Sequence, residues 1–342
     1  NLDEGILKDA VIHTVAAIIG MIPEGLLLLT SSVMAVSVVR LSKYNVLVQQ
    51  LYCIETLARV DVICLDKTGT ITEGAMELED VICEEGVDDR ELDEVLINFC
   101  SAMENSNATL DALKLKYKSQ GDWTVTDKIE FSSSRKFSAV SFDERGSYYL
   151  GAPEFVLKRD FSKYKDKILG YSDYRVLVVA FNEEKLEEKP KNLKVLGFIL
   201  IQDKIRKEAP DTLKYFKEQG VDVKIISGDN FVTVCNIVKR VGLEDVKGMD
   251  ATLLNDDNID KCLEEYDVFG RVTPEQKKRI VEVLQKNGHT VAMTGDGVND
   301  VLALKKADCS IAMASGSDAA KNVSQLVLLD SNFASLPEVV AE

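Results

Sequence analysis

Short apolar runs, most of which end at an aspartate or a glycine turn, alternate with helical stretches and constrain the fold of this chain most. The runs are VDVICLD at 60–66, VDVKIISGD at 221–229, YDVFGRV at 266–272, HTVAMTGDGVND at 289–300 and DCSIAM at 308–313. Helical patterns lie between them at 209–220, 230–242 and 273–288. This alternation predicts right-handed βαβ units on a parallel, Rossmann-like sheet. Such sheets carry their chemistry just beyond the carboxyl ends of the strands, where the aspartates stand.

Residues 77–201 break this rhythm. They contain charged stretches, Trp123 and two alternating segments, KFSAVSFD at 136–143 and GSYYLGA at 146–152. Alternation with a period of two is typical of half-buried antiparallel strands. We therefore expect an inserted α+β domain, with a return hinge in IQDKIRKEAP at 201–210.

An apolar run from Ala10 to Val39 precedes both regions, and Glu24 is its one residue that is surely charged. About 20 apolar residues span a bilayer. Arg40 and Lys43 follow the run, which favours a cytoplasmic location for that end. A buried helix of a soluble protein is the alternative, but a helix of this length would normally have a polar face. No cleavage-site pattern follows the run, so we expect a membrane helix and no signal peptide.

The sequence IPEG at 22–25 lies inside this apolar run. Pro23 removes a backbone donor and Gly25 loosens the next turn, so the helix should break and free carbonyl oxygens. The Glu24 carboxylate beside free carbonyls is a surrounding that suits a hard transported cation. The alternative is a simple kink in which Glu24 pairs with a neighbouring helix.

Charge and cysteine content argue against a nucleic-acid-binding protein, a disulfide framework and a zinc site. The net charge of −16 disfavours nucleic acid as a partner, because its phosphates are also negative. The seven cysteines form no CxxC pair, so we expect reduced thiols and neither a disulfide framework nor a zinc site.

The strand-ending Asp66 points to phosphoryl transfer. A carboxylate can attack phosphorus and form an acyl phosphate. Mg²⁺ can bring the two anions together by binding Asp66, Asp296 and the phosphate, with the backbone carbonyl of Thr68 as a further ligand. The alternative is an aspartate that only caps a turn, which does not explain why similar residues follow several strands.

Other polar residues near the strand ends and in one helix fit the same chemistry. Lys277 stands in the first turns of the helix that begins with Thr273 as N-cap and Pro274 at its first position. The lysine can neutralise the transferring oxygens, while the Ser227 hydroxyl and the Gly228 amide can donate hydrogen bonds to them.

DKTGT at 66–70, SGDN at 227–230, TPEQK at 273–277 and TGDGVND at 294–300 together resemble the P-type ATPases of the haloacid-dehalogenase-like superfamily. The resemblance implies that Asp66 is the phosphorylated aspartate. It further assigns residues to the phosphate site and to the Mg²⁺-linked end of the site. Those of the phosphate site are Lys277, Ser227, Gly228 and Asp229, and those of the Mg²⁺ end are Asp296, Asn299 and Asp300.

The inserted domain resembles the nucleotide-binding domain of the same family. In EFSSSRKFSAV at 130–140, Phe131 would stack on adenine and Lys136 would approach the nucleotide. Gly151 begins a GAPE motif, and Arg175 and Arg271 are further nucleotide-site residues by the same resemblance.

Three departures from the family pattern stand out. Leu150 replaces the lysine expected before GAPE, so one adenine contact is missing, and Ser227 replaces a threonine with its hydroxyl kept. IPEG resembles the fourth membrane helix of calcium-pump-like members, whose glutamate binds the ion, but Leu27 replaces the second proline of animal calcium pumps. The leucine favours a bacterial branch of the calcium-pump-like members. The cysteine–proline motif that heavy-metal pumps have at this place is absent.

The resemblance implies four segments. They are a transmembrane segment at 1–42, the first part of a phosphorylation domain at 43–76, a nucleotide-binding domain at 77–201 and the second part of the phosphorylation domain at 202–342. We expect the catalytic portion of an ATP-driven cation pump, with Ca²⁺ as the transported cation. It would lie in a bacterial cell membrane, with both large domains in the cytoplasm. Its partners would be Mg²⁺, ATP, the cation and the membrane. An actuator domain and further membrane helices are not seen, so we expect a fragment that does not transport by itself.

Two other functions remain. A soluble phosphatase of the superfamily commonly has a second aspartate two residues after the nucleophile, where this chain has Thr68. A non-catalytic nucleotide-binding module would not need Asp66, Lys277, Asp296 and Asp300 together.

Overall fold

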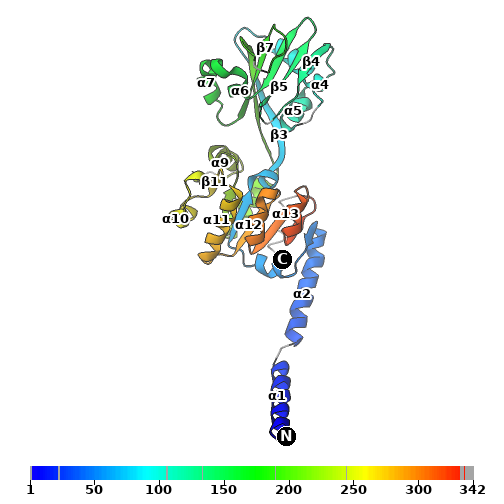
Figure 1. The fold of residues 1–342 in the computed structure, drawn as a ribbon, viewed down its shortest axis with the longest axis vertical. Coiled ribbons are helices and arrows are strands. Elements are labelled where there is room, and N and C mark those ends of the chain that lie inside the picture. Colours follow the sequence, from blue (N-terminus) through cyan, green and yellow to red (C-terminus); the bar gives the residue numbers. More distant parts are fainter. Residues whose placement is uncertain are drawn as a thin grey trace. The chain divides into compact units, whose positions relative to one another are not determined.

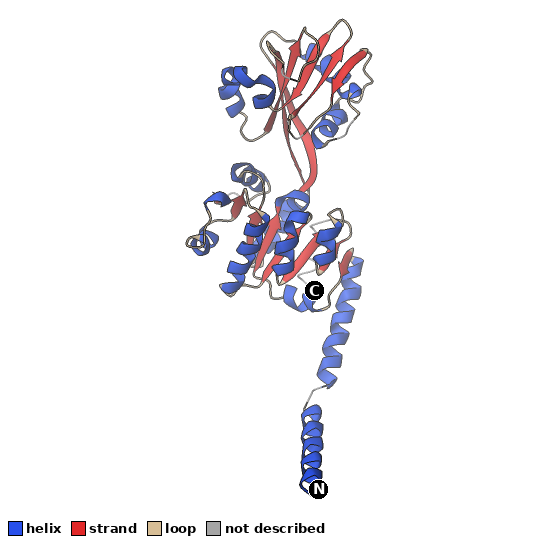
Figure 2. Cartoon of the chain, viewed as in Figure 1, coloured by secondary structure: helices blue, strands red, loops and turns tan. Residues whose placement is uncertain are grey.

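The computed structural model describes residues 2–21, 24–104, 107–132, 134–188, 190–243, 245–331 and 335 (Figure 1). It contains one eight-stranded and one six-stranded sheet (Figure 2). The chain divides into two compact units, one of 1–65, 214–224 and 273–342 and the other of 66–213 and 225–272. The boundary cuts through two strands of the eight-stranded sheet.

The eight-stranded sheet has the order β1-β14-β13-β12-β2-β9-β11-β10. Its strands are β1 Val46–Val48, β2 Val62–Asp66, β9 Asp222–Ile226, β10 Gly248–Asp250, β11 Val268–Gly270, β12 Val291–Gly295, β13 Cys309–Met313 and β14 Leu326–Leu328. β12 pairs in parallel with β2 and with β13, and β9 pairs in parallel with β11. The predicted parallel sheet is therefore confirmed, and its five predicted runs are β2, β9, β11, β12 and β13.

The outer strands were not predicted. β1 lies in the stretch 41–50, which reads as a linker, and it pairs antiparallel with β14 at the edge of the sheet. β10 pairs in parallel with β11 at the other edge.

Helices connect these strands. They are α3 Tyr52–Leu57, α8 Ala209–Glu218, α9 Phe231–Arg240, α10 Ile259–Glu265, α11 Pro274–Lys286, α12 Val301–Lys306 and α13 Asp318–Val323, with short 3₁₀ turns at Ala251–Leu253 and Val298–Asp300. α11, α12 and α13 lie side by side over one face of the sheet (Figure 1). α11 begins as predicted, because the Thr273 hydroxyl accepts from the Gln276 amide and Pro274 occupies the first helical position.

The six-stranded sheet is antiparallel throughout, with the order β3-β8-β7-β6-β5-β4. Its strands are β3 Thr72–Cys83, β4 Val125–Ile129, β5 Phe137–Phe142, β6 Gly146–Gly151, β7 Arg175–Asn182 and β8 Lys194–Ile205. Its helices are α4 Asp89–Ala102, α5 Ala108–Lys116, α6 Pro153–Leu157 and α7 Phe161–Leu169, with a 3₁₀ turn at Lys158–Asp160. One apolar core joins the sheet to α4 and α5, and a second joins it to α6 and α7. The inserted α+β domain is thereby confirmed.

Two apolar helices stand at the N-terminus, α1 Leu2–Gly20 and α2 Glu24–Lys43. By length and composition, Gly5–Lys43 is one candidate membrane span among the described residues. α1 ends and α2 begins on either side of Ile22 and Pro23, which lie outside the described residues together with the Glu24 side chain. The ion-site prediction for Glu24 therefore stays a prediction.

Candidate active site

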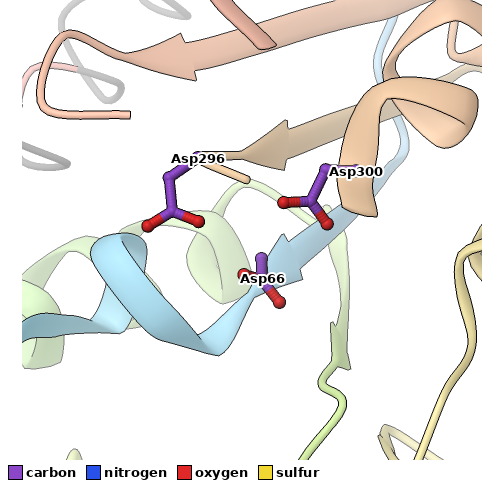
Figure 3. A group of neighbouring side chains, drawn as sticks. All are labelled: Asp66, Asp296 and Asp300. Atoms are coloured by element: carbon purple, nitrogen blue, oxygen red, sulfur yellow. The ribbon is translucent and has the colours of Figure 1, made fainter. Parts of the chain in front are cut away.

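Three carboxylates gather at the carboxyl end of two paired strands. Asp66 is the last residue of β2, Asp296 directly follows β12, and Asp300 ends the next turn. Because β2 and β12 are parallel neighbours, with Met293 opposite Cys64, their carboxyl ends meet at one edge. One carboxylate oxygen of each aspartate lies within 4.8 Å of one oxygen of each of the others (Figure 3).

This donor set fits Mg²⁺. Three carboxylates at such a separation repel one another, and Asp66 and Asp300 are only 7% and 2% exposed, so little water screens them. A hard divalent cation with oxygen ligands removes that repulsion and leaves positions for phosphate oxygens. Asp66, Asp296 and Asp300 would hold the ion, and the predicted ligand Thr68 lies exposed in the turn that follows Asp66.

Asp300 is held in place from two sides. Its Oδ1 atom accepts a hydrogen bond of 2.6 Å from Lys277 Nζ, and its Oδ2 atom accepts one of 3.0 Å from the Gly297 amide. Each carboxylate oxygen has two lone pairs, so both bonds leave acceptor capacity for a metal ion. Lys277 is 5% exposed in α11, so the fold brings this predicted residue to the carboxylate cluster. Asn299 is exposed in the turn between Asp296 and Asp300.

The loop after β9 carries three predicted phosphate-site residues, Ser227, Gly228 and Asp229. Ser227 is 3% exposed, and its hydroxyl accepts from the Asp229 amide at 3.2 Å. Gly228 is exposed. The Asp229 carboxylate makes an ion pair with Lys67. The loop thus has an inward serine, an open glycine and an aspartate engaged by a lysine.

Lys67 is a residue that the sequence did not mark as functional. Its side chain is 3% exposed and contacts the carboxylates of Asp203 and Asp229, the former at 2.9 Å. Burial alone would lower the pKa of Lys67, but the two carboxylates outweigh it and raise that pKa above its ordinary value. Lys67 is therefore a charged, buried ammonium directly after Asp66. A lysine adjoining an apolar strand was the available sequence clue.

Three predicted nucleotide-site residues lie in neighbouring segments of the six-stranded sheet. Phe131 is 45% exposed, and Lys136 is exposed with a left-handed φ of 58°. The Ala152 amide donates to the Lys136 carbonyl at 3.0 Å, and Phe137 is opposite Gly151 across β5 and β6. A side chain at Gly151 would collide with Phe137, so the close approach of these strands requires glycine.

Other predicted nucleotide-site residues are placed separately. Arg175 is exposed at the start of β7. Arg271 has a left-handed φ of 56°, and its guanidinium donates to Asp250 at 3.1 Å. Leu150, which replaces the expected lysine, is 5% exposed in the core that includes α4 and α5.

Comparisons with known proteins bear on the family and the fold of this chain. The family model of the haloacid dehalogenase-like hydrolases matches residues 60–308. "Probable cation-transporting ATPase exp7" of Streptococcus pneumoniae is 41% identical over 98% of this chain and 44% of its own length. "Calcium-transporting ATPase CtpE" of Mycobacterium bovis is 42% identical over 98% of this chain and 43% of its own length. "Probable cation-transporting P-type ATPase" of Mycoplasma genitalium is 32% identical over 97% of this chain and 41% of its own length.

Among solved structures, a zinc-transporting PIB-type ATPase in its E2.Pi state superposes with a TM-score of 0.71 at 20% identity. The match covers 91% of this chain and 45% of that one, and at this identity it bears on the fold alone. The chain spans less than half the length of these curated relatives. The resemblance to P-type ATPases that the motifs predict is confirmed, and the chain belongs to the haloacid dehalogenase-like hydrolase family.

Proposed function

We propose that this chain performs the phosphorylation step of an ATP-driven cation pump. The carboxylate of Asp66 attacks the γ-phosphorus of ATP, a new P–O bond forms, and the bond to ADP breaks so that ADP leaves with its electron pair. The product is an aspartyl phosphate. The observation that carries the proposal is the placement of Asp66, Asp296 and Asp300 within 4.8 Å of one another.

The remaining residues of the site would position and neutralise the phosphoryl group. Bound Mg²⁺ would supply the positive charge that lets an anionic carboxylate approach an anionic phosphate. Lys277, which contacts Asp300, would stabilise the developing charge on the phosphoryl oxygens. Ser227 and the exposed Gly228 amide would donate hydrogen bonds to the same oxygens, while Asn299 would act at the Mg²⁺-linked end.

ATP would bind through the six-stranded sheet. The exposed ring of Phe131 and the exposed Lys136 suit a purine and its phosphates. Gly151 permits the close strand approach beside them, and Arg175 and Arg271 would meet the phosphates. The proposal keeps the four segments expected from the sequence. They are the transmembrane segment at 1–42, the two parts of the phosphorylation domain at 43–76 and 202–342, and the nucleotide-binding domain at 77–201.

The transported ion in this proposal is Ca²⁺, with Glu24 as one ligand. Two observations support it: a candidate membrane span that contains Glu24, and relatives that are named as calcium-transporting. The chain would work in a bacterial cell membrane, with its two sheets in the cytoplasm.

A phosphatase of the same superfamily is less well supported. Fast hydrolysis of the acyl phosphate needs a proton-transferring group near Asp66. Thr68 replaces the carboxylate that such phosphatases commonly have, and the neighbouring Lys67 is occupied by Asp203 and Asp229. A long-lived acyl phosphate is what a pump requires.

Acid-quenched labelling tests the proposal. Membranes that contain the protein are mixed with γ-labelled ATP and Mg²⁺, with and without a calcium chelator, and the trapped label is treated with hydroxylamine. We expect hydroxylamine-sensitive label that depends on calcium and is absent from Asp66→Asn. Label that is indifferent to calcium would overturn the ion assignment alone. Absence of label under every cation tried would overturn the phosphorylation step and leave the nucleotide-binding module.

A further inference from the structure

A buried cation joins three separate segments beside the candidate active site. Lys67 belongs to the turn after β2, Asp203 to β8, and Asp229 to the loop after β9. The Lys67 side chain is 3% exposed, its partner Asp203 is 13% exposed and its partner Asp229 is 44% exposed. Lys67 is thus enclosed by two carboxylates that the chain brings from distant positions.

The loop after β9 is linked to this contact through Asp229. The Asp229 amide donates to the Ser227 hydroxyl, and the Arg271 amide donates to the Asp229 carbonyl at 2.6 Å. Ser227 and Asp229 are therefore hydrogen-bonded to each other on either side of Gly228. Because Lys67 holds the Asp229 carboxylate, it is connected through Asp229 to the Ser227 hydroxyl.

The turn that carries Lys67 is itself fastened. Arg206 donates from its guanidinium to the Gly69 carbonyl at 3.0 Å and from its amide to the Ile71 carbonyl at 3.0 Å. Gly69 has a left-handed φ of 73°, which glycine adopts without strain. Lys67 consequently projects from a fixed turn toward its two partners.

We propose that Lys67 is a positioning residue for phosphoryl transfer, acting through Asp229 on the Ser227–Gly228 pair and not by contact with the phosphate. The inference rests on the proposed function of Asp66. Two of the three ammonium protons have carboxylate partners already, which suits a structural cation better than a phosphate ligand. The positive charge of Lys67 sets the distance between the turn after Asp66 and the loop that would bind the phosphoryl oxygens.

Loss of the Lys67 charge should act through repulsion. In Lys67→Met the carboxylates of Asp203 and Asp229 would face each other without a cation, and removal of one partner from a buried ionic group is far more costly than removal of both. Neutralising the more buried carboxylate as well, in Lys67→Met/Asp203→Asn, leaves only the half-exposed Asp229, which water can screen. Rescue by this second change distinguishes a charge-balancing role from simple packing.

The test measures phosphoenzyme formation and nucleotide affinity in the whole protein. Lys67→Met should lower the rate constant of phosphorylation about 100-fold and leave the dissociation constant of trinitrophenyl-ATP within about threefold. Lys67→Arg, which keeps the charge, should stay within about tenfold of wild type, and Lys67→Met/Asp203→Asn should recover at least about tenfold over Lys67→Met. Lys204→Met is the matched control, because Lys204 lies beside Asp203 on β8 and pairs with Glu73 near the surface.

A second readout does not depend on activity. Amide hydrogen exchange of a peptide covering 225–231 should accelerate in Lys67→Met but not in Lys204→Met. Unchanged exchange, or a Lys67→Met enzyme that phosphorylates within about threefold of wild type, would overturn the positioning role. Absence of label in the wild-type protein would instead overturn the proposed function, and the exchange data would still decide whether Lys67 fixes the loop. If Lys67→Met does not fold, the double variant and Lys67→Arg carry the comparison.

Discussion

Lys277 and Asp300 form a buried ion pair at the candidate active site, with Lys277 Nζ 2.6 Å from Asp300 Oδ1 and side chains that are 6% and 2% exposed. The pair joins the first turns of α11 to the turn after β12. A lysine held by a carboxylate keeps its position before any phosphate arrives, so it can meet developing charge without reorganisation.

Removal of this lysine should destabilise the protein as well as inactivate it. In Lys277→Met the Asp300 charge remains buried without its cation, and we expect the free energy of unfolding to fall by about 3 kcal/mol in Mg²⁺-free buffer. Urea denaturation monitored by circular dichroism measures this change.

Lys278→Met is the matched control for that experiment. Lys278 is the next residue on α11 and pairs at 3.5 Å with Glu282, with side chains 46% and 29% exposed. Such a surface pair contributes about 0.5 kcal/mol or less. Equal losses in the two variants would contradict the view that Asp300 depends on Lys277.

Mg²⁺ should stabilise the folded protein even without nucleotide. The carboxylates of Asp66, Asp296 and Asp300 repel one another, and a cation bound only by the folded state raises stability by mass action. At about 100 times its dissociation constant, Mg²⁺ should add about 2.7 kcal/mol, which differential scanning calorimetry detects as a raised melting temperature.

Replacing one aspartate by asparagine distinguishes specific Mg²⁺ binding from a general effect of ionic strength on stability. Asp296→Asn should lose most of the Mg²⁺ response, whereas Asp318→Asn, at a side chain 91% exposed, should retain it. A response that Asp296→Asn keeps, or that K⁺ reproduces at equal ionic strength, would argue against a site formed by the three aspartates.

The strands and the carboxylate cluster were predictable because their determinants are local. Each central strand is a short apolar run, β2 ends at Asp66 and Asp296 directly follows β12, and parallel pairing then forces Asp66 and Asp296 to the same edge. Thr273 and Pro274 likewise mark the start of α11 by residue type alone.

Other features depend on contacts that the sequence does not show. β1 and β14 are three-residue strands that pair with each other, with Val46 opposite Leu328, and each is too short to show a pattern of its own. The partners of Lys67 come from β8 and from the loop after β9. Asp229 was predicted as a phosphate-site residue from its motif, and its ion pair with Lys67 could not be foreseen without the order of the strands.

Gly151 offers a test of the nucleotide site that leaves the aspartates unchanged. A methyl group there would collide with Phe137 and with the carbonyl of Lys136. Because these are the neighbouring strand and its backbone, Gly151→Ala should displace the Lys136 segment, weaken trinitrophenyl-ATP binding about tenfold and cost about 1–3 kcal/mol of stability.

Gly170→Ala serves as the comparison within the same six-stranded unit. Its added methyl would meet the Lys167 carbonyl at 3.2 Å, a far milder contact, at the end of α7. Fluorescence titration should therefore separate the two variants. Equal affinities in Gly151→Ala and wild type would remove Lys136 and Gly151 from the proposed nucleotide site.

Cys83 should behave as an unreactive thiol although it is only partly buried at the end of β3. Burial, followed by the hydrogen bond and charge of Asp89, raises the pKa of Cys83 to about 12. Since the thiolate is the nucleophile, alkylation by iodoacetamide should rise about tenfold per pH unit from pH 7 to 10 without the plateau of an ordinary thiol near pH 9.

Asp89→Asn removes a cause of the upward pKa shift of Cys83, so it should speed alkylation at pH 8. Mass spectrometry of digested protein measures the alkylation rate of Cys83 in wild type and in Asp89→Asn. Cys235 on α9, whose own pKa burial raises, is the internal control for the effect of the substitution. A plateau below pH 9, or no acceleration in Asp89→Asn, would show that Asp89 does not suppress the Cys83 thiolate.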